Sequence, residues 1–499
     1  MNRRTAHRRP TTSLALLSLS ALVLASCAQT GSSNGTSGDG DTGAAGRGTA
    51  TTQGEEVQAG VEEATSDGGG QDSEAAQASE PVPDAVVREA AGPAPRLAVS
   101  YDGGVMVIDA MSLDVLTQAP LEGFVRLNPA GDGRHLFVTE GDSLRLLDAG
   151  TWSEPHGNHD HSYTTTPSLT DLTLDGEKPG HVVPHGGRTA LYFDGAGRVD
   201  LIDPTTLDAS AGQITIERSH EVPEAHHGVA LLLEDGSLLE TVGTSEERTG
   251  ARVVDADGQE TARTEECPGV HGEAVAADDV VVLGCQDGLV VYRDGDFSKV
   301  NSPDDYGRIG NQAGTPLSPI VLGDYKVDED ADLERPERVS LTDTRTGELQ
   351  LVDLGTSYTF RSLARGPQGE GLVLGTDGSL HVIDVESGEV AQQIPVVEEW
   401  EEPAEWQQPR PTLFVLGQFG YVTEPATREL HILDLDTMAV IDSVQLPEVP
   451  NELTGVDGRV ADSGHGAGSG HEGHEGHEDH DDHDDHDHED HEDHEGHDH

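Results

Sequence analysis

Histidine is the residue type whose number and spacing most clearly predict chemistry in this sequence. Of the 25 histidines, twelve lie between His465 and His499, and from His471 onward the chain contains only His, Asp, Glu and Gly. Imidazole and carboxylate groups bind divalent transition metals, and plain solubility would need no histidine. We therefore predict that the tail, residues 461–499, is disordered and binds several metal ions. Its candidate ligands are His471, His474, His477, His480, His483, His486, His488, His491, His494, His497 and His499.

A second group of histidines lies in the middle of the chain, each just before an expected strand. If equivalent positions on neighbouring structural units converge, three or four imidazoles and one carboxylate would form a preorganised tetrahedral site. The alternative for each histidine alone is a hydrogen-bonded turn residue. The candidates are His181, His185, His226, His227 and His271, with Glu273 or Glu224 as the carboxylate.

A third group occupies the segment EPHGNHDH, which contains His156, His159 and His161. Their close spacing is like that of the tail, so the segment is either a secondary metal site or a polar loop. The residues alone do not decide between these two interpretations.

The ligand types favour zinc over other metals. Only four methionines are present, and no free thiol is expected, which disfavours Cu(I). Calcium prefers oxygen ligands to imidazole. Zinc fits best, and nickel and copper(II) are the alternatives.

The elements that must position the central histidines are short, repeated strands. Alternating apolar residues, closed by Asp-Gly or Gly-Asp turns and ending in Asp, are typical of β-hairpins. A hairpin repeated every 40–55 residues or so indicates an all-β propeller, with eight blades favoured and seven as the alternative if the short first unit completes the last blade. The eight units are 97–109, 135–148, 189–203, 228–255, 280–294, 320–343, 371–384 and 413–434.

The N-terminus has the features of an export signal. Four arginines precede a short apolar run and the tetrad Leu24-Ala25-Ser26-Cys27, which resembles the bacterial lipobox. We expect cleavage before Cys27 and lipid attachment to its sulfur, the alternative being an ordinary signal peptide. The mature protein would be lipid-anchored at the outer face of the cytoplasmic membrane. The expected organisation is a signal peptide (1–26), a disordered linker (27–95), the propeller (96–460) and the tail (461–499).

Two cysteines remain for the folded protein. In an oxidising compartment Cys267 and Cys285 would form a disulfide. A metal role is the weaker alternative, since the sequence has no C-x-x-C.

Composition and motifs exclude several classes of function. The formal net charge is −65, from 94 acidic and 29 basic residues, which disfavours binding to nucleic acid. The chain has no nucleophile elbow and no H-E-x-x-H motif, so we do not expect an enzyme.

Three segments of the central region resemble a known family. They are PGHVVPHGGRTALYFDGAG (179–197), AHHGVA (225–230) and CPGVHGEA (267–274), and they are similar to periplasmic zinc metallochaperones of the AztD type. The resemblance covers roughly residues 96–450. It implies a β-propeller that binds zinc on one face and passes it to the solute-binding protein of a zinc ABC importer. The five central histidines lie within these segments and are therefore candidate zinc ligands.

One departure from that family concerns the flexible histidines. Family members carry a His-rich stretch near the mature N-terminus, whereas here that end lacks histidine and the C-terminal tail supplies it. The expected function is an extracytoplasmic zinc chaperone, and the alternative is a surface zinc buffer or metal sensor with no transfer partner.

Overall fold

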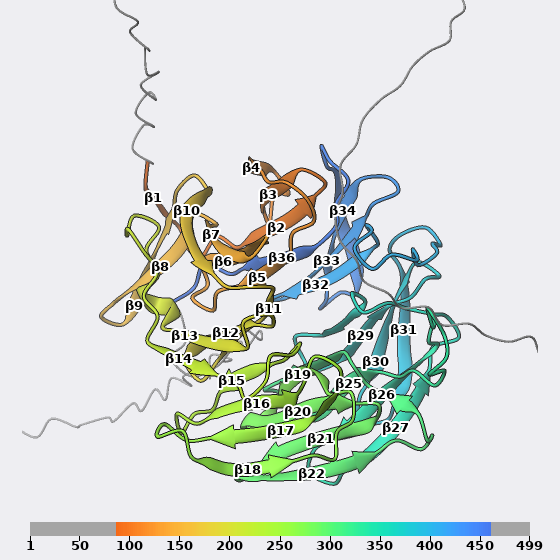
Figure 1. Cartoon of the computed structure of the whole chain (residues 1–499). Helices are drawn as coiled ribbons and strands as arrows, with labels where there is room; N and C mark the ends of the chain where they lie inside the picture. Colours follow the sequence, from red (N-terminus) through yellow and green to blue (C-terminus); the bar gives the residue numbers. More distant parts are fainter. Residues whose placement is uncertain (1–85, 461–499) are drawn as a thin grey trace, which may run out of the picture. The chain divides into compact units, whose positions relative to one another are not determined.

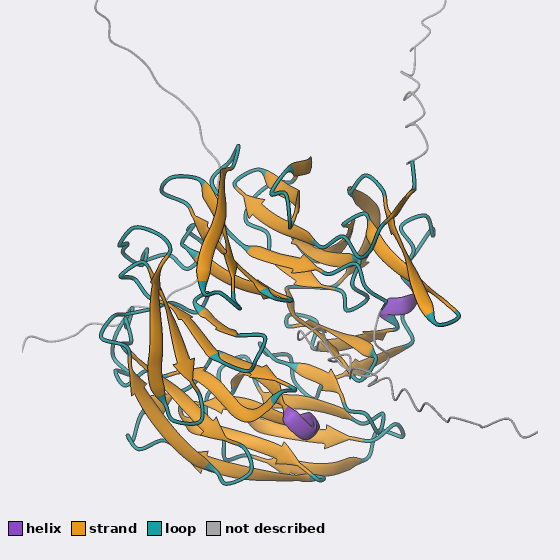
Figure 2. Cartoon of the chain, turned by 180° about the vertical axis from the view of Figure 1, so that it is seen from behind, coloured by secondary structure: helices purple, strands orange, loops and turns teal. Residues whose placement is uncertain are grey.

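The computed structural model describes residues 86–460, and strands form nearly all of the regular structure in this range (Figure 2). The helical elements there are two single 3₁₀ turns, η1 (Pro204–Thr206) and η2 (Ala277–Asp279). The signal peptide, most of the expected linker and the tail lie outside the described residues.

The strands form eight antiparallel sheets of four strands, numbered here as blades 1 to 8 (Figure 1). Each blade is given from its innermost to its outermost strand. Blade 1 is β36 (Leu453–Val456), β2 (Arg96–Tyr101), β3 (Gly104–Asp109) and β4 (Val115–Pro120). Blade 2 is β5 (Leu127–Pro129), β6 (His135–Glu140), β7 (Ser143–Asp148) and β10 (Ser168–Asp175). Blade 3 is β11 (Pro179–His185), β12 (Arg188–Phe193), β13 (Arg198–Ile202) and β14 (Arg218–Glu221).

The middle of the chain forms blades 4 to 6. Blade 4 is β15 (Ala230–Leu232), β16 (Leu238–Gly243), β17 (Arg248–Val254) and β18 (Glu260–Thr264). Blade 5 is β19 (His271–Ala276), β20 (Val280–Cys285), β21 (Asp287–Arg293) and β22 (Asp296–Asn301), with β23 (Gly307–Arg308) pairing in parallel with β21. Blade 6 is β24 (Gln312–Thr315), β25 (Ser318–Asp324), β26 (Arg338–Asp343) and β27 (Glu348–Asp353).

The last part of the chain completes the ring. Blade 7 is β28 (Leu363–Arg365), β29 (Gly371–Leu374), β30 (Ser379–Asp384) and β31 (Glu389–Pro395). Blade 8 is β32 (Thr412–Leu416), β33 (Phe419–Glu424), β34 (Glu429–Asp434) and β35 (Ala439–Gln445). Strand β36 then pairs with β2, so blade 1 combines both ends of the folded chain (Figure 1). The propeller prediction is confirmed with eight blades, because β36 completes the short first unit.

Burial explains which strands are apolar and which are polar. The two middle strands of each blade are covered on both faces by neighbouring blades, so most of their residues are buried and apolar; all six residues of β20 are buried. Outer strands such as β4 are mostly exposed. The core between blades 4 and 5 shows the packing, because Leu231 and Leu239 contact the cluster that contains Leu283.

The aspartate that closes most units has a local structural role. The carboxylate of Asp109 accepts the backbone N–H groups of Met111 and Ser112, and Asp434 does the same for Asp436 and Thr437. Such contacts fix the turn between the third and fourth strands, which is why the residue recurs with the blade period.

A ninth sheet of three strands is attached to blade 2. Its strands are β8 (Thr151–His156) and β9 (His159–Thr164), which form a hairpin between β7 and β10, and β1 (Arg88–Ala90), which pairs with β9. Strand β1 lies within residues 27–95, where the sequence predicted disorder. That expectation is wrong for residues 88–90. The edge strand β9 has free backbone hydrogen-bonding groups, and even a polar segment can pair with them.

Candidate metal centre

Three histidines from three consecutive blades converge at one place. His181 lies in β11 of blade 3, His227 in the segment that leads into β15 of blade 4, and His271 begins β19 of blade 5. One ring nitrogen from each lies within 4.8 Å of the others, and Nε2 of His227 is 3.2 Å from Nε2 of His271. We call these residues the three-blade cluster. Three imidazoles at this separation could hold one divalent metal ion.

Irregularities in the innermost strands help to aim these side chains. The pairing of β11 with β12 shifts register between Pro179 and Val182, and that of β19 with β20 shifts between His271 and Glu273. A bulge of this kind inserts an extra residue and re-aims its side chain. Two of the three histidines therefore point out of the regular ladder at the start of a strand.

Hydrogen bonds orient two of the rings. Nδ1 of His227 is 2.6 Å from the Asp194 carboxylate, and Nδ1 of His271 is 2.7 Å from the carbonyl oxygen of Gly310. An Nδ1–H that donates to these oxygens leaves the Nε2 lone pair free for a metal, the usual arrangement around metal-binding histidines. Nδ1 of His181 lies 3.4 Å from the carboxylate of Glu273, so one carboxylate adjoins the cluster.

Glycine is required at two positions beside the cluster. A Cβ on Gly180 would collide with the Asp194 carboxylate, and Gly272 has a φ of +73°. The first glycine lets Asp194 approach β11, and the second allows the left-handed bulge after His271.

The electrostatic environment favours a neutral imidazole at His271. Burial lowers the pKa of His271 to about 3, and the neighbouring histidines and Arg308 act in the same direction, against the hydrogen bond to Gly310. Because a metal ligand must be an unprotonated imidazole, His271 is ready to bind at any physiological pH.

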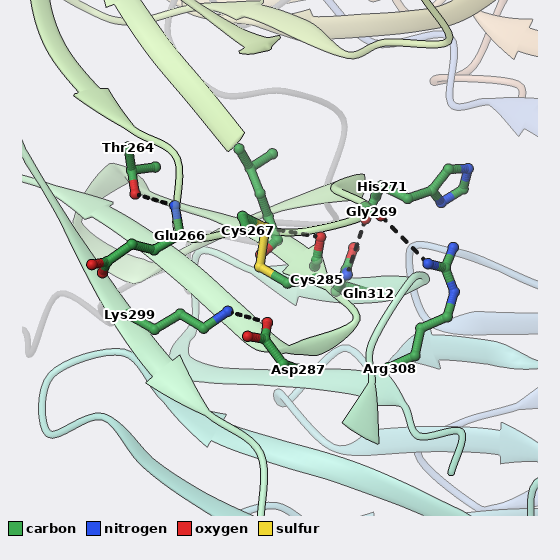
Figure 3. The surroundings of a disulfide bond; sticks show 12 residues. Thr264, Glu266, Cys267, Gly269, His271, Cys285, Asp287, Lys299, Arg308 and Gln312 are labelled. Atoms are coloured by element: carbon green, nitrogen blue, oxygen red, sulfur yellow. Dashed lines mark hydrogen bonds and ion pairs between the residues drawn. A yellow bond between two sulfur atoms is a disulfide. The ribbon is translucent and has the colours of Figure 1, made fainter. Parts of the chain in front are cut away.

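Two arginines, Arg248 and Arg308, contact Gly269, which precedes His271 by two residues. The positive charge of Arg308 lowers the pKa of Arg248, in addition to the larger effect of burial. Arg308 donates to the carbonyl oxygen of Gly269 at 3.4 Å, on the same side of the loop as His271 (Figure 3). Neither guanidinium has a carboxylate within 4 Å among residues 86–460.

A disulfide anchors the segment that carries His271. Cys267 and Cys285 are bonded with an S–S distance of 1.98 Å, as the sequence predicted. Figure 3 shows this bond connecting the start of the Cys267–His271 loop to the end of β20. The bond restrains the approach of the chain to the cluster from its own blade.

Two of the expected central ligands lie elsewhere. The ring of His185 is buried between the carbonyl oxygen of Leu232 (2.6 Å) and the carboxylate of Asp279 (2.7 Å). Burial lowers its pKa, but these two contacts outweigh burial, so the pKa of His185 is raised. His226 is 3% exposed, and its nitrogens contact the carbonyl oxygen of Glu224 and the hydroxyl of Thr241. Both fit the alternative interpretation of hydrogen-bonded histidines, and Glu224 contributes its backbone rather than its carboxylate.

The EPHGNHDH segment forms the tip of the β8–β9 hairpin, and its histidines also converge. Nε2 of His161 is 3.2 Å from Nε2 of His159 and 3.3 Å from Nδ1 of His156. The other nitrogen of His161 contacts the carboxylate of Glu89, in β1, at 2.8 Å. This hairpin cluster is largely exposed and could hold a metal ion that exchanges quickly.

A third group was not expected from the sequence. Glu424, Glu429 and His431 place one ligand atom each within 4.8 Å at the β33–β34 turn. The Glu424 carboxylate already accepts the Thr427 hydroxyl at 2.9 Å and the backbone N–H of Glu398 at 3.1 Å. Nδ1 of His431 contacts the hydroxyl of Ser443 at 2.8 Å. These bonds give the group a structural role within blade 8.

The expected lipid attachment site and the tail ligands cannot be compared with the structure. Cys27 and the tail histidines lie outside the described residues. Among residues 86–460, no helix combines the length and apolar character needed to cross a membrane.

Comparison with known proteins agrees with the motif resemblance. No family model matches the chain. The curated zinc chaperone AztD of Citrobacter koseri is 27% identical over 374 residues, which cover 74% of this chain and 87% of the relative. A crystal structure of C. koseri AztD matches with a TM-score of 0.63 at 26% identity, and a structure of its apo form with a TM-score of 0.62 at 26% identity. Each match covers 74% of this chain and 100% of the other. In both sequence and fold, this chain is similar to the AztD zinc chaperone.

Proposed function

We propose that this protein is an extracytoplasmic zinc chaperone that holds Zn²⁺ at the three-blade cluster. The observation that carries the proposal is the convergence of His181, His227 and His271, whose ring nitrogens lie within 4.8 Å of one another. The similarity to AztD of C. koseri, itself a zinc chaperone, supports zinc as the cargo.

The chemistry of the cluster suits a carrier that must release its ion. Three neutral imidazoles bind Zn²⁺ firmly, and a fourth ligand comes from Glu273 or from an incoming group. Because Asp194 and Gly310 already orient two of the rings, little reorganisation is needed on binding. His227 is partly exposed, so an incoming ligand can replace it stepwise without releasing a free aqua ion.

We further propose that the receiver is the solute-binding protein of a zinc ABC importer and that lipid at Cys27 keeps the chaperone at the membrane. Tethering would raise its effective concentration beside the importer. The hairpin cluster, whose ligands are largely exposed, and the histidine-rich tail would collect zinc at lower affinity.

A transfer assay tests this function. The full-length chain is loaded with one equivalent of Zn²⁺ and mixed with the zinc-free binding protein, with and without an excess of a competing chelator. A chaperone transfers zinc through direct contact, so chelator should not intercept the ion. If chelator captures all the zinc before the binding protein does, the protein is a buffer and the chaperone proposal fails.

A further inference from the structure

The guanidinium groups of Arg248 and Arg308 make few contacts with the rest of the fold, although the backbones of both residues belong to strands. Nη1 of Arg248 is buried and has no hydrogen-bond partner, and the side chain makes no ion pair within residues 86–460. The side chain of Arg308 makes one long hydrogen bond within residues 86–460, to a backbone oxygen. The charge of Asp194 acts to raise the pKa of Arg248, but Asp194 forms no ion pair with it. Burying part of a cation without a hydrogen-bonded carboxylate costs free energy, and in a chain with 94 acidic and 29 basic residues such a partner would be easy to supply.

The position of the pair makes an anion the expected ligand. Both residues contact Gly269, two positions before His271: the backbone N–H of Gly269 donates to the carbonyl oxygen of Arg248 at 2.7 Å, and Nη1 of Arg308 donates to the carbonyl oxygen of Gly269 at 3.4 Å. Guanidinium groups recognise carboxylates with paired, charge-assisted hydrogen bonds. A ligand that carried carboxylates and imidazoles together could bind the arginines and the zinc ion at once.

The chain itself contains such a segment. Residues 471–499 hold eleven histidines and fifteen Asp and Glu residues with no Lys or Arg. We propose that Arg248 and Arg308 form a docking site for this tail, which places tail imidazoles on the zinc ion of the three-blade cluster. This inference rests on the proposed function, because it assigns a partner to the same zinc site.

The length of the tail allows this contact. Gly458 lies against the base of the β8–β9 hairpin, where its carbonyl oxygen accepts the Ser153 hydroxyl at 2.7 Å. The innermost strands of a propeller run in the same direction, so the end of β36 lies on the face opposite the starts of β11 and β19. The 39 residues after Val460 can extend to roughly 130 Å, whereas a domain of this size has a radius of gyration of about 21 Å. The tail can therefore reach around the propeller.

Docking in this way would give zinc a route between its two kinds of site. A tail that carries zinc is brought to the cluster by its carboxylates, and its imidazoles exchange with His227 while the ion stays coordinated. No bond other than the metal–ligand bonds changes, and no redox partner is needed.

The test uses a labelled peptide of residues 471–499 and a full-length "neutral-tail chain", in which every His, Asp and Glu from His465 to His499 is replaced by Asn or Gln. Fluorescence anisotropy measures peptide binding with and without Zn²⁺, and a parallel zinc titration measures the three-blade cluster. We expect the peptide to bind, and zinc to strengthen binding. The double variant Arg248→Gln/Arg308→Gln should weaken binding about tenfold or more.

Matched variants separate this contact from unrelated effects. Arg263→Gln removes an exposed arginine that is already paired with Glu260 and Glu265, and should leave peptide binding unchanged. Arg308→Lys keeps the charge but loses the paired geometry, and should give an intermediate loss; it also serves if the double variant fails to fold. A peptide with all its carboxylates amidated should bind as weakly as the native peptide binds the double variant.

Two results would overturn the docking proposal while leaving the zinc site intact. One is normal zinc binding at the cluster with no peptide binding, or with equal binding to the double variant. The other is a double variant that binds the peptide normally but transfers zinc more slowly to the importer's binding protein. This result would show that the arginines bind that partner instead of the tail. By contrast, a zinc titration that finds no zinc bound at the three-blade cluster of the neutral-tail chain would refute the proposed function.

Discussion

The hydrogen bond that His227 donates to Asp194 gives the sharpest test of how the cluster is organised. Asp194→Asn removes the charge that fixes the His227 ring, at a 2.6 Å contact. Loss of such a supporting carboxylate lowers metal affinity by about 10–100-fold, or roughly 1.4–2.7 kcal/mol. Asparagine keeps one acceptor oxygen, and the pair is partly exposed, with side-chain exposures of 45% and 18%. We therefore expect a loss near tenfold for Asn and a larger one for Asp194→Ala.

The assay is a competition titration with a chromophoric zinc chelator on the neutral-tail chain, so that tail ligands do not contribute. Asp279→Asn is the matched control, because it removes the same type of contact from His185, at 2.7 Å, outside the cluster. It should leave zinc affinity unchanged. Equal losses in both variants, or no loss in Asp194→Asn, would show that Asp194 does not organise the zinc site.

Three further predictions follow from the same structure. Replacing Cys267 and Cys285 by Ser opens a loop with a sequence separation of 18, which should lower the free energy of unfolding by about 3 kcal/mol in urea titrations and weaken zinc binding; unchanged values would mean the bond restrains nothing. The pKa of His271 is about 3 in the native state and near 6.5 in the unfolded state, so the unfolded chain binds more protons between these two pH values. The free energy of unfolding of the zinc-free protein should therefore fall as the pH drops through this window. His271→Asn should reduce that dependence, and an identical pH profile would contradict it. Replacing the histidines of the hairpin cluster by Asn should remove one weakly bound zinc from the neutral-tail chain without altering the tightest site, as measured by metal content after dialysis.

Much of the fold could be predicted from the sequence because its signals are local. Each hairpin is specified by alternating apolar residues and a turn, and the closing aspartate fixes the next turn, as at Asp109. Closure of the ring was harder to foresee, since it depends on β36, a four-residue strand that pairs with β2 across most of the chain. Strand β1 was missed for the same reason, because only its partner β9 makes it a strand.

Which of the central histidines come together could not be predicted from the sequence, although the segments that carry them could. Strict alternation places His181 and His185 on the same face of β11, yet the register shift after Pro179 separates them. His226 and His227 are adjacent in one loop, and only packing against Tyr192 and Thr241 shows that the first is turned inward. The supporting role of Asp194 had no separate signal, although it lies within a segment that resembles AztD.

The most direct test of the central claim is a zinc-edge anomalous difference map from crystals of the full-length protein grown with one equivalent of Zn²⁺. The account predicts that the strongest peak lies among His181, His227 and His271, about 2.0–2.1 Å from a ring nitrogen of each. A strongest peak at the hairpin cluster or at blade 8, with none among these three residues, would contradict it.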